Sequence, residues 1–181
     1  MISFKMKKNK SKKTTKQLVL VVIKPDGMSK FLVGKVLQKF LADKLEVVAA
    51  QVVAVSKKLA EEHYKHIKGQ PFYRGTIDVM LGKSYKQKKV LALILCGSRA
   101  ILKCRDIAGA TNPKDAHPQS IRGAFGRVTP QGVFENVVHV SSDPKEAERE
   151  IKLWFAPNQI NAKIYPTKNV RLNRHTKTVW V

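Results

Sequence analysis

The sequence predicts a single α+β domain, on three observations. Apolar runs rich in Val, typical of buried strands, alternate with segments whose apolar residues recur at helical spacing. The 181 residues fit one domain, and 43 % of them are hydrophobic, which is enough for a core at this size. The order of these segments suits a ferredoxin-like sheet or a flavodoxin-like parallel sheet, and periodicity alone does not choose between them.

The first half of the chain contains two predicted strands and two predicted helices. Leu18–Ile23 is a continuous apolar run, as expected of a strand covered on both faces. Apolar residues at helical spacing then predict a helix of about three turns over residues 32–41. The second strand is predicted at Val47–Val55, and Ser56 is a suitable N-cap for the helix after it.

The second half continues the alternation. A weak helical stretch at Ile77–Leu81 precedes a buried strand at Val90–Leu95 and a short helix around Ala100–Ile107. Residues 108–135 are rich in Gly, Pro, Asn and Gln, and we expect a long connection without regular structure, which is usually functional. Asn136–Ser141 is the fourth predicted strand.

The last predicted helix has a clear start. Asp143, Pro144 and Glu146 suit the N-cap, first-turn and third positions of a helix that ends near Phe155. After so short a turn, this helix must fold back along the strand that precedes it.

Glu150 and His139 are therefore expected to meet. Glu150 lies roughly 10 Å along the helix axis at 1.5 Å per residue, so the helix brings it back beside His139. A carboxylate at one imidazole nitrogen fixes the tautomer and leaves the other nitrogen free as a nucleophile. Cationic and hydroxyl groups suited to phosphoryl transfer are also present, namely Lys24, Arg105, Thr111 and Arg122.

The charge of the chain is strongly positive and uneven. Thirty-five Lys and Arg against thirteen Asp and Glu give a formal charge of +22. Residues 1–16 hold seven Lys and residues 157–181 hold five Lys or Arg, with no acidic residue in either segment. We expect both ends to bind RNA, DNA or other polyanions without sequence preference.

Several other classes of protein and site are excluded by the sequence. No apolar run approaches the roughly 20 residues that a bilayer requires, and no membrane partner is expected. Cys96 and Cys104 offer no disulfide framework, which suits the cytoplasm, or the nucleus if the source has one. His63 and His66 lack the partners of a metal site, and no metal held by the protein is expected.

Seven motifs in unbroken order resemble the nucleoside diphosphate kinase family. Together they extend over residues 17–157, and their collinearity makes a chance resemblance very improbable. The motifs are Lys24-Pro25-Asp26-Gly27, Ala60-Glu61-Glu62-His63-Tyr64, Gly69-Gln70-Pro71-Phe72-Tyr73, Gly109-Ala110-Thr111-Asn112-Pro113, Ser120-Ile121-Arg122-Gly123, Asn136-Val137-Val138-His139 and Ala147-Glu148-Arg149-Glu150-Ile151.

The resemblance implies a fold and a reaction. The fold is a ferredoxin-like four-stranded antiparallel sheet with helices packed on its faces. The catalytic domain would span residues 17–157, between a basic tail (1–16) and a basic extension (158–181). The reaction is a ping-pong exchange, in which a nucleoside triphosphate phosphorylates His139 and the phosphoryl group then passes to a nucleoside diphosphate.

The resemblance also implies roles for individual residues. His139 is the nucleophile, Glu150 orients its ring, and Lys24 takes part in catalysis. Phe72 stacks on the base, which fits low base specificity. Mg²⁺ travels with the nucleotide phosphates instead of sitting in a protein cage. The protein is implied to be a homo-oligomer. The nucleotide-binding residues are Lys24, Tyr64, Phe72, Arg105, Thr111, Arg122 and Asn136.

Three features depart from the family pattern. Val140 and Ser142 stand where a small residue and Asp are usual, and Ala124 replaces an Asp. The loop from Arg122 to Asn136 is also a few residues longer than in many members. These departures support an alternative, in which a weakened or inactive member of the fold binds nucleic acid or ribonucleoprotein through its charge.

Overall fold

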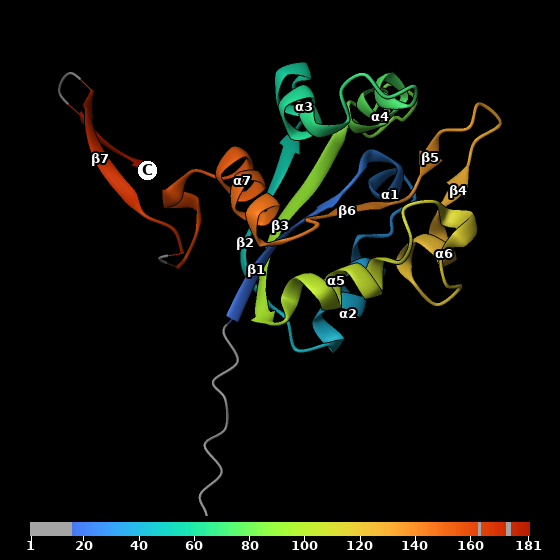
Figure 1. Ribbon diagram of the computed structural model, residues 1–181, viewed down its shortest axis with the longest axis horizontal. Coiled ribbons are helices and arrows are strands. Elements are labelled where there is room, and N and C mark those ends of the chain that lie inside the picture. Colours follow the sequence, from blue (N-terminus) through green and yellow to red (C-terminus); the bar gives the residue numbers. More distant parts are fainter. Residues whose placement is uncertain (1–15, 163, 173–174) are drawn as a thin grey trace, which may run out of the picture.

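A four-stranded sheet forms the centre of the computed structural model, which describes residues 16–162, 164–172 and 175–181 (Figure 1). The strands are β1 (Lys16–Ile23), β2 (Glu46–Ala54), β3 (Lys89–Ser98) and β6 (Val138–Val140), in the spatial order β2-β3-β1-β6. Every neighbouring pair is antiparallel. The predicted ferredoxin-like sheet is therefore confirmed, and the flavodoxin-like parallel sheet is wrong.

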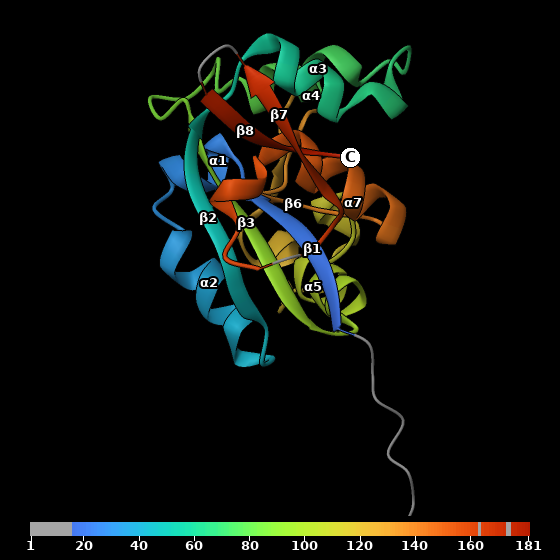
Figure 2. The ribbon, with the colours of Figure 1, turned by 90° about the vertical axis from the view of Figure 1, so that its left-hand side faces the viewer.

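Helices cover both faces of this sheet, and Figures 1 and 2 show the two layers. Helices α2 (Val33–Ala42) and α5 (Ala100–Ala108) pack on one face, where they form a core with Val19, Val21 and Ile23 of β1. Helices α3 (Lys57–His63), α4 (Tyr73–Met80) and α7 (Pro144–Trp154) pack on the other, against Leu20 and Val22. Successive residues of β1 thus enter opposite cores, which explains the continuous apolar run.

None of the helices within residues 16–162, 164–172 and 175–181 combines the length and the apolar character that crossing a bilayer requires.

The predicted helix caps are confirmed. The Ser56 hydroxyl oxygen accepts a hydrogen bond of 3.1 Å from the backbone N–H of Leu59 at the start of α3. The Asp143 carboxylate accepts from the backbone N–H groups of Lys145 and Glu146, both at 2.9 Å, at the start of α7. These bonds satisfy N–H groups that have no partner inside the helix, and they fix where each helix begins.

The connection predicted at residues 108–135 is more regular than expected. It contains η2 (Pro113–Asp115), α6 (Ile121–Phe125) and the two-stranded hairpin of β4 (Arg127–Val128) and β5 (Phe134–Glu135). The expectation of no regular structure is therefore wrong. Hydrogen bonds from backbone N–H groups to the side chains of Asn112 and Ser120 begin the two helical pieces, and such local bonds leave no periodic apolar signal.

Further short elements complete the chain. Three of them are helical and follow a strand or helix closely, namely α1 (Pro25–Ser29), η1 (Lys65–Ile67) and η3 (Pro157–Gln159). The fourth strand, predicted over residues 136–141, extends only over Val138–Val140, because the backbone turns at Val137.

The C-terminal extension forms a hairpin of β7 (Thr167–Leu172) and β8 (His175–Trp180), which the sequence analysis did not predict (Figure 1, red). The indole N–H of Trp180 donates a 2.8 Å hydrogen bond to the carbonyl of Phe155, just after α7. The division at residue 157 stays a prediction. Of the predicted basic tail, residues 1–15 lie outside the described residues, and Lys16 begins β1.

Candidate active site

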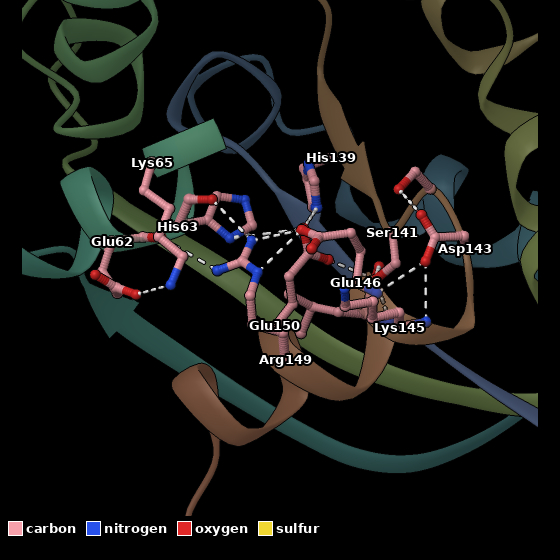
Figure 3. A network of polar contacts seen from close by, with 12 residues as sticks. Glu62, His63, Lys65, His139, Ser141, Asp143, Lys145, Glu146, Arg149 and Glu150 are labelled. Atoms are coloured by element: carbon pink, nitrogen blue, oxygen red, sulfur yellow. Dashed lines mark hydrogen bonds and ion pairs between the residues drawn. The ribbon is translucent and has the colours of Figure 1, made fainter. Parts of the chain in front are cut away.

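His139 and Glu150 lie side by side, as the helix arithmetic predicted. His139 is the middle residue of β6, and Glu150 lies on α7, which folds back over the sheet. Nε2 of His139 is 2.9 Å from Oε1 of Glu150 (Figure 3). The Glu150 side chain is 2 % exposed and that of His139 is 15 % exposed. Because Nε2 faces the buried carboxylate, Nδ1 is the ring nitrogen left for chemistry.

Ser141 holds the other oxygen of Glu150. Its hydroxyl donates a 2.6 Å hydrogen bond to Oε2 of Glu150 and accepts one of 3.1 Å from the backbone N–H of Leu20. Burial alone would raise the pKa of Glu150, but His139, Ser141 and Arg149 outweigh it and hold the pKa below its ordinary value. The carboxylate is therefore ionised and fixed at both oxygens.

A second imidazole, that of His63 on α3, packs against the His139 ring. The ring centroids are 4.3 Å apart, edge to face. The indole N–H of Trp154 donates a 3.1 Å hydrogen bond to Nδ1 of His63. Burial lowers the pKa of His63 well below its ordinary value, and His139 adds to the effect. His63 is therefore a neutral ring that supports His139.

The ligand-type atoms of His63, His139 and Glu150 lie within 4.8 Å of one another. His63 Nδ1 already accepts the Trp154 N–H, and Glu150 already contacts His139 and Ser141. Nδ1 of His63 and both oxygens of Glu150 therefore already have protein partners. His66, the other member of the His pair in the sequence, is exposed, whereas His63 is fully buried.

Two cations, the buried Lys24 and the half-buried Arg122, lie near the start of β6. Arg122, on α6, donates from Nη1 to the Gly109 carbonyl at 2.7 Å and from Nη2 to the Val138 carbonyl at 3.0 Å. Burial lowers the pKa of Arg122 to about 10. Burial also lowers the pKa of Lys24, and the carboxylate of Asp26 opposes that shift. Arg122 therefore stays charged near neutral pH, and the neighbouring carboxylates oppose the loss of charge from Lys24. Cationic groups in a poorly hydrated place favour a phosphate ligand.

Of the remaining predicted site residues, Asn136 and Tyr64 are buried, whereas Phe72 and Arg105 are exposed. Asn136 is buried, and its amide donates a 2.7 Å hydrogen bond to the Thr111 carbonyl. The Tyr64 ring lies 6.1 Å from the His139 ring, and burial raises the Tyr64 pKa, so its hydroxyl stays protonated. Phe72 is 57 % exposed, and Arg105 is exposed on α5, so both are open to a ligand from solvent.

Val137 has a strained backbone that sequence reasoning missed. Its φ is +67°, a left-handed value that is costly for a β-branched residue. Its N–H donates a 2.8 Å hydrogen bond to Oδ2 of the fully buried Asp26, and its carbonyl accepts one of 2.8 Å from the Lys24 N–H. A Cβ on Gly27 would come within 2.9 Å of Val137. The segment after β1 thus holds the turn that leads into His139.

The departures from the family pattern leave the His139–Glu150 pair intact. Val140 is buried in the core between the sheet and α2 and α5, because its side chain alternates with that of His139 along β6. Ser142 is exposed and donates a 2.7 Å hydrogen bond to the capping residue Asp143. The Val140 side chain therefore points away from the His139 ring.

Ala124, which stands where the family has an Asp, is exposed. The longer loop from Arg122 to Asn136 supplies a different carboxylate, which is buried. Glu135 of β5 is 4 % exposed and accepts hydrogen bonds from Arg127, Tyr85 and Lys30. Arg127 contributes most to lowering the pKa of Glu135, to about 2. The negative charge of Glu135 raises the pKa of Lys24 and so helps keep that ammonium group charged.

Comparisons with known proteins agree with the motifs. A family model described as nucleoside diphosphate kinase matches residues 17–160. A nucleoside diphosphate kinase of Thermococcus kodakarensis is 37 % identical over 141 residues, 78 % of this chain and 78 % of the relative. That of Symbiobacterium thermophilum is 41 % identical over 135 residues, 75 % of this chain and 84 % of the relative.

Among solved structures, a similar one is a transition state mimic of nucleoside-diphosphate kinase from Borrelia burgdorferi with bound vanadate and ADP. Its TM-score is 0.73 and its sequence is 30 % identical, and the match covers 82 % of this chain and 92 % of that chain.

Proposed function

Because this chain belongs to the nucleoside diphosphate kinase family and is a phosphotransferase, we propose that it carries the phosphoryl group on Nδ1 of His139. The observation that supports this assignment most directly is the Nε2–Oε1 distance of 2.9 Å between His139 and Glu150. The carboxylate directs Nδ1 away from itself and stabilises the positive charge that develops on the ring.

The reaction has two half-reactions. Nδ1 attacks the terminal phosphorus of a nucleoside triphosphate, an N–P bond forms, and the P–O bond to the leaving nucleoside diphosphate breaks with its electron pair on oxygen. A terminal oxygen of a second nucleoside diphosphate then attacks the phosphorus. The N–P bond breaks, and its electron pair returns to Nδ1 of His139.

The cations stabilise the charge on the transferring group. Arg122 is fixed by two backbone carbonyls, and its buried Nε has no protein partner among the described residues. Lys24 is buried at the end of β1 beside the turn that leads to His139. We assign phosphate binding to both, together with Arg105 and Thr111. Fixed donors of this kind stabilise the charge of phosphoryl transfer without reorganisation.

The nucleoside has its own contacts. The exposed face of Phe72 stacks on the base, and Asn136 and Tyr64 bind the ribose or phosphates near His139. Because both Glu150 oxygens are engaged by His139 and Ser141, a divalent cation fits better on the nucleotide than on this carboxylate. Mg²⁺ would therefore arrive on the phosphates and neutralise part of their charge.

Intact mass measurement tests the assignment of the nucleophile. Incubation with Mg-ATP should add one phosphoryl group that acid removes and that disappears on addition of a nucleoside diphosphate. His139→Ala should add none while keeping the circular dichroism of the parent protein. Substantial turnover by that variant would show that the nucleophile is another residue.

We also propose that the basic ends bind polyanions. In the C-terminal hairpin, Lys168, Arg171 and Lys177 are exposed. Removing residues 1–15, or replacing the three hairpin cations by Gln, should weaken binding of a labelled RNA and lower the salt dependence of its affinity. Turnover should stay unchanged in both variants. Unchanged RNA affinity in both would overturn this proposal.

Assembly and compartment complete the proposal. Strand β2 lies at the edge of the sheet, and its Val52 is 60 % exposed, which favours association of copies into a homo-oligomer. Light scattering on the protein as it elutes from a size-exclusion column tests this, and a monomer mass would refute it.

Cys96 and Cys104 are both free thiols, which supports a cytoplasmic or nuclear location that cell fractionation can check.

A further inference from the structure

The guanidinium of Arg149 joins α7 to the end of α3 (Figure 3). Its Nη1 donates to the Glu62 carbonyl at 3.2 Å, and its Nη2 donates to the His63 carbonyl at 3.1 Å. Nε and Nη2 also donate to Oε2 of Glu146, at 3.0 and 2.8 Å. The same Nη2 lies 3.8 Å from Oε1 of Glu150. One planar group thus connects two backbone carbonyls and two carboxylates.

These contacts fix α3 relative to α7. Glu62 and His63 are the last residues of α3, where carbonyls have no partner inside the helix. Arg149 supplies donors to both carbonyls, and only a forked side chain can reach them together. His63 packs on the His139 ring, and Tyr64 follows it directly. The position of Arg149 therefore sets how closely the α3 side chains approach the nucleophile.

The positive charge of Arg149 acts on Glu150 and on the residues around it. Glu150 is faced by His139 of β6, by Ser141 after β6, by His63 and Tyr64 at the end of α3, and by Arg149 on its own helix. Arg149 is the one permanent cation in that set. It lowers the pKa of Glu150, and it also lowers that of His63. It therefore favours a charged Glu150 together with a neutral His63.

We propose that Arg149 is a positioning residue for phosphoryl transfer, which holds the end of α3 through its fork and keeps Glu150 ionised through its charge. The proposal rests on the role given above to His139 and Glu150. Arg149 itself need not touch the nucleotide, because both of its effects pass through neighbouring side chains.

The test separates the charge of Arg149 from its fork. Arg149→Gln removes the charge, Arg149→Lys keeps the charge but loses the fork, and Lys145→Gln removes one charge from an exposed position on the same helix. The rate of phosphorylation of the enzyme by Mg-ATP is measured in single turnovers over a range of pH. Thermal unfolding of each variant at the same concentration confirms that it is folded.

The expected shift follows from linkage. Arg149 is one of the groups that hold the pKa of Glu150 low, so loss of its positive charge favours the protonated carboxyl beside His139. The acid limb of the pH profile should therefore move upward by about one pH unit in Arg149→Gln. It should stay in place in Arg149→Lys and Lys145→Gln. The rate on the plateau should fall severalfold in Arg149→Lys, because the α3 carbonyls lose their bidentate partner.

The outcomes distinguish this inference from the proposed function. An acid limb in Arg149→Gln that coincides with that of the parent protein would overturn the inference. An equal shift in Arg149→Lys would overturn the assignment to charge. Absence of any acid-labile adduct on the folded parent protein would instead refute the nucleophile assignment, before Arg149 is tested.

Discussion

Replacing Ser141 by Ala should destabilise the protein through one deleted oxygen. Ser141 is fully buried, and its hydroxyl connects β1 to α7. It accepts from the Leu20 N–H and donates to Glu150. The Ala variant removes no bulk beyond this oxygen, so the change measures the hydrogen bonds and not a large cavity.

The magnitude follows from the two groups that lose a partner. A buried N–H left without an acceptor costs about 1–2 kcal/mol, and loss of a hydrogen bond to a carboxylate costs about 1.5–3 kcal/mol. Rearrangement of nearby groups restores part of the lost hydrogen bonding. We therefore expect the free energy of unfolding to fall by about 2–4 kcal/mol at pH 7. For a chain of this length that corresponds to a decrease of about 4–16 °C in Tm.

Urea unfolding followed by circular dichroism measures the loss, at fixed protein concentration and at several pH values. The folded-state pKa of Glu150 lies below its ordinary value, so the stabilisation from its charge is present above the ordinary Glu range and disappears as the pH falls through the folded pKa. The difference between the parent protein and Ser141→Ala should therefore shrink in acid.

Ser142→Ala is the matched control, because Ser142 is the exposed neighbour of Ser141. It should change the free energy of unfolding by no more than about 0.5 kcal/mol. A loss of that small size in Ser141→Ala, or a larger loss that does not depend on pH, would refute the reasoning about Glu150.

Four further changes test other contacts. Glu150→Gln should keep nucleotide affinity but slow phosphorylation of the enzyme about 100-fold in rapid-quench experiments, because an amide does not stabilise the ring cation; an unchanged rate would contradict the orienting role. Phe72→Ala should raise KM about tenfold with kcat unchanged in steady-state assays, since stacking contributes about 1–3 kcal/mol; an unchanged KM would place the base elsewhere. Glu135→Gln should lower stability in urea at neutral pH, and the difference should vanish as the pH falls towards the Glu135 pKa of about 2, whereas a difference that persists there would argue against an ionic cause. Trp154→Phe deletes the N–H donated to His63 and should cost about 1 kcal/mol in thermal unfolding; no loss would mean that the hydrogen bond contributes nothing net.

The parts of the fold that carry a periodic apolar pattern could be predicted from the sequence. The run at Leu18–Ile23 belongs to β1, and the caps at Ser56 and Asp143 begin α3 and α7. The meeting of His139 with Glu150 followed from helix rise and a short turn, both of which are local properties. Local rules therefore sufficed where each element interacts mainly with its neighbours in the sequence.

The parts that depend on tertiary contacts could not be predicted in this way. Ser141, Trp154 and Arg149 are unremarkable in the sequence, and each matters because of a residue that only folding brings near. The β4–β5 hairpin is held by Glu135, which collects donors from Lys30 and other separate segments. The C-terminal hairpin lacks strong alternation, because a two-stranded ribbon buries little surface of its own.

The central place of β1 has a consequence for synthesis on the ribosome. Val21 pairs with Leu93 on one side and with Val140 on the other, so the strand that emerges first waits for partners made much later. During that delay an apolar, Val-rich segment stays available for pairing with other nascent chains. The seven Lys of residues 1–16 adjoin this segment, and like charges repel. We therefore expect the Lys-rich segment beside β1 to oppose aggregation of that strand during synthesis.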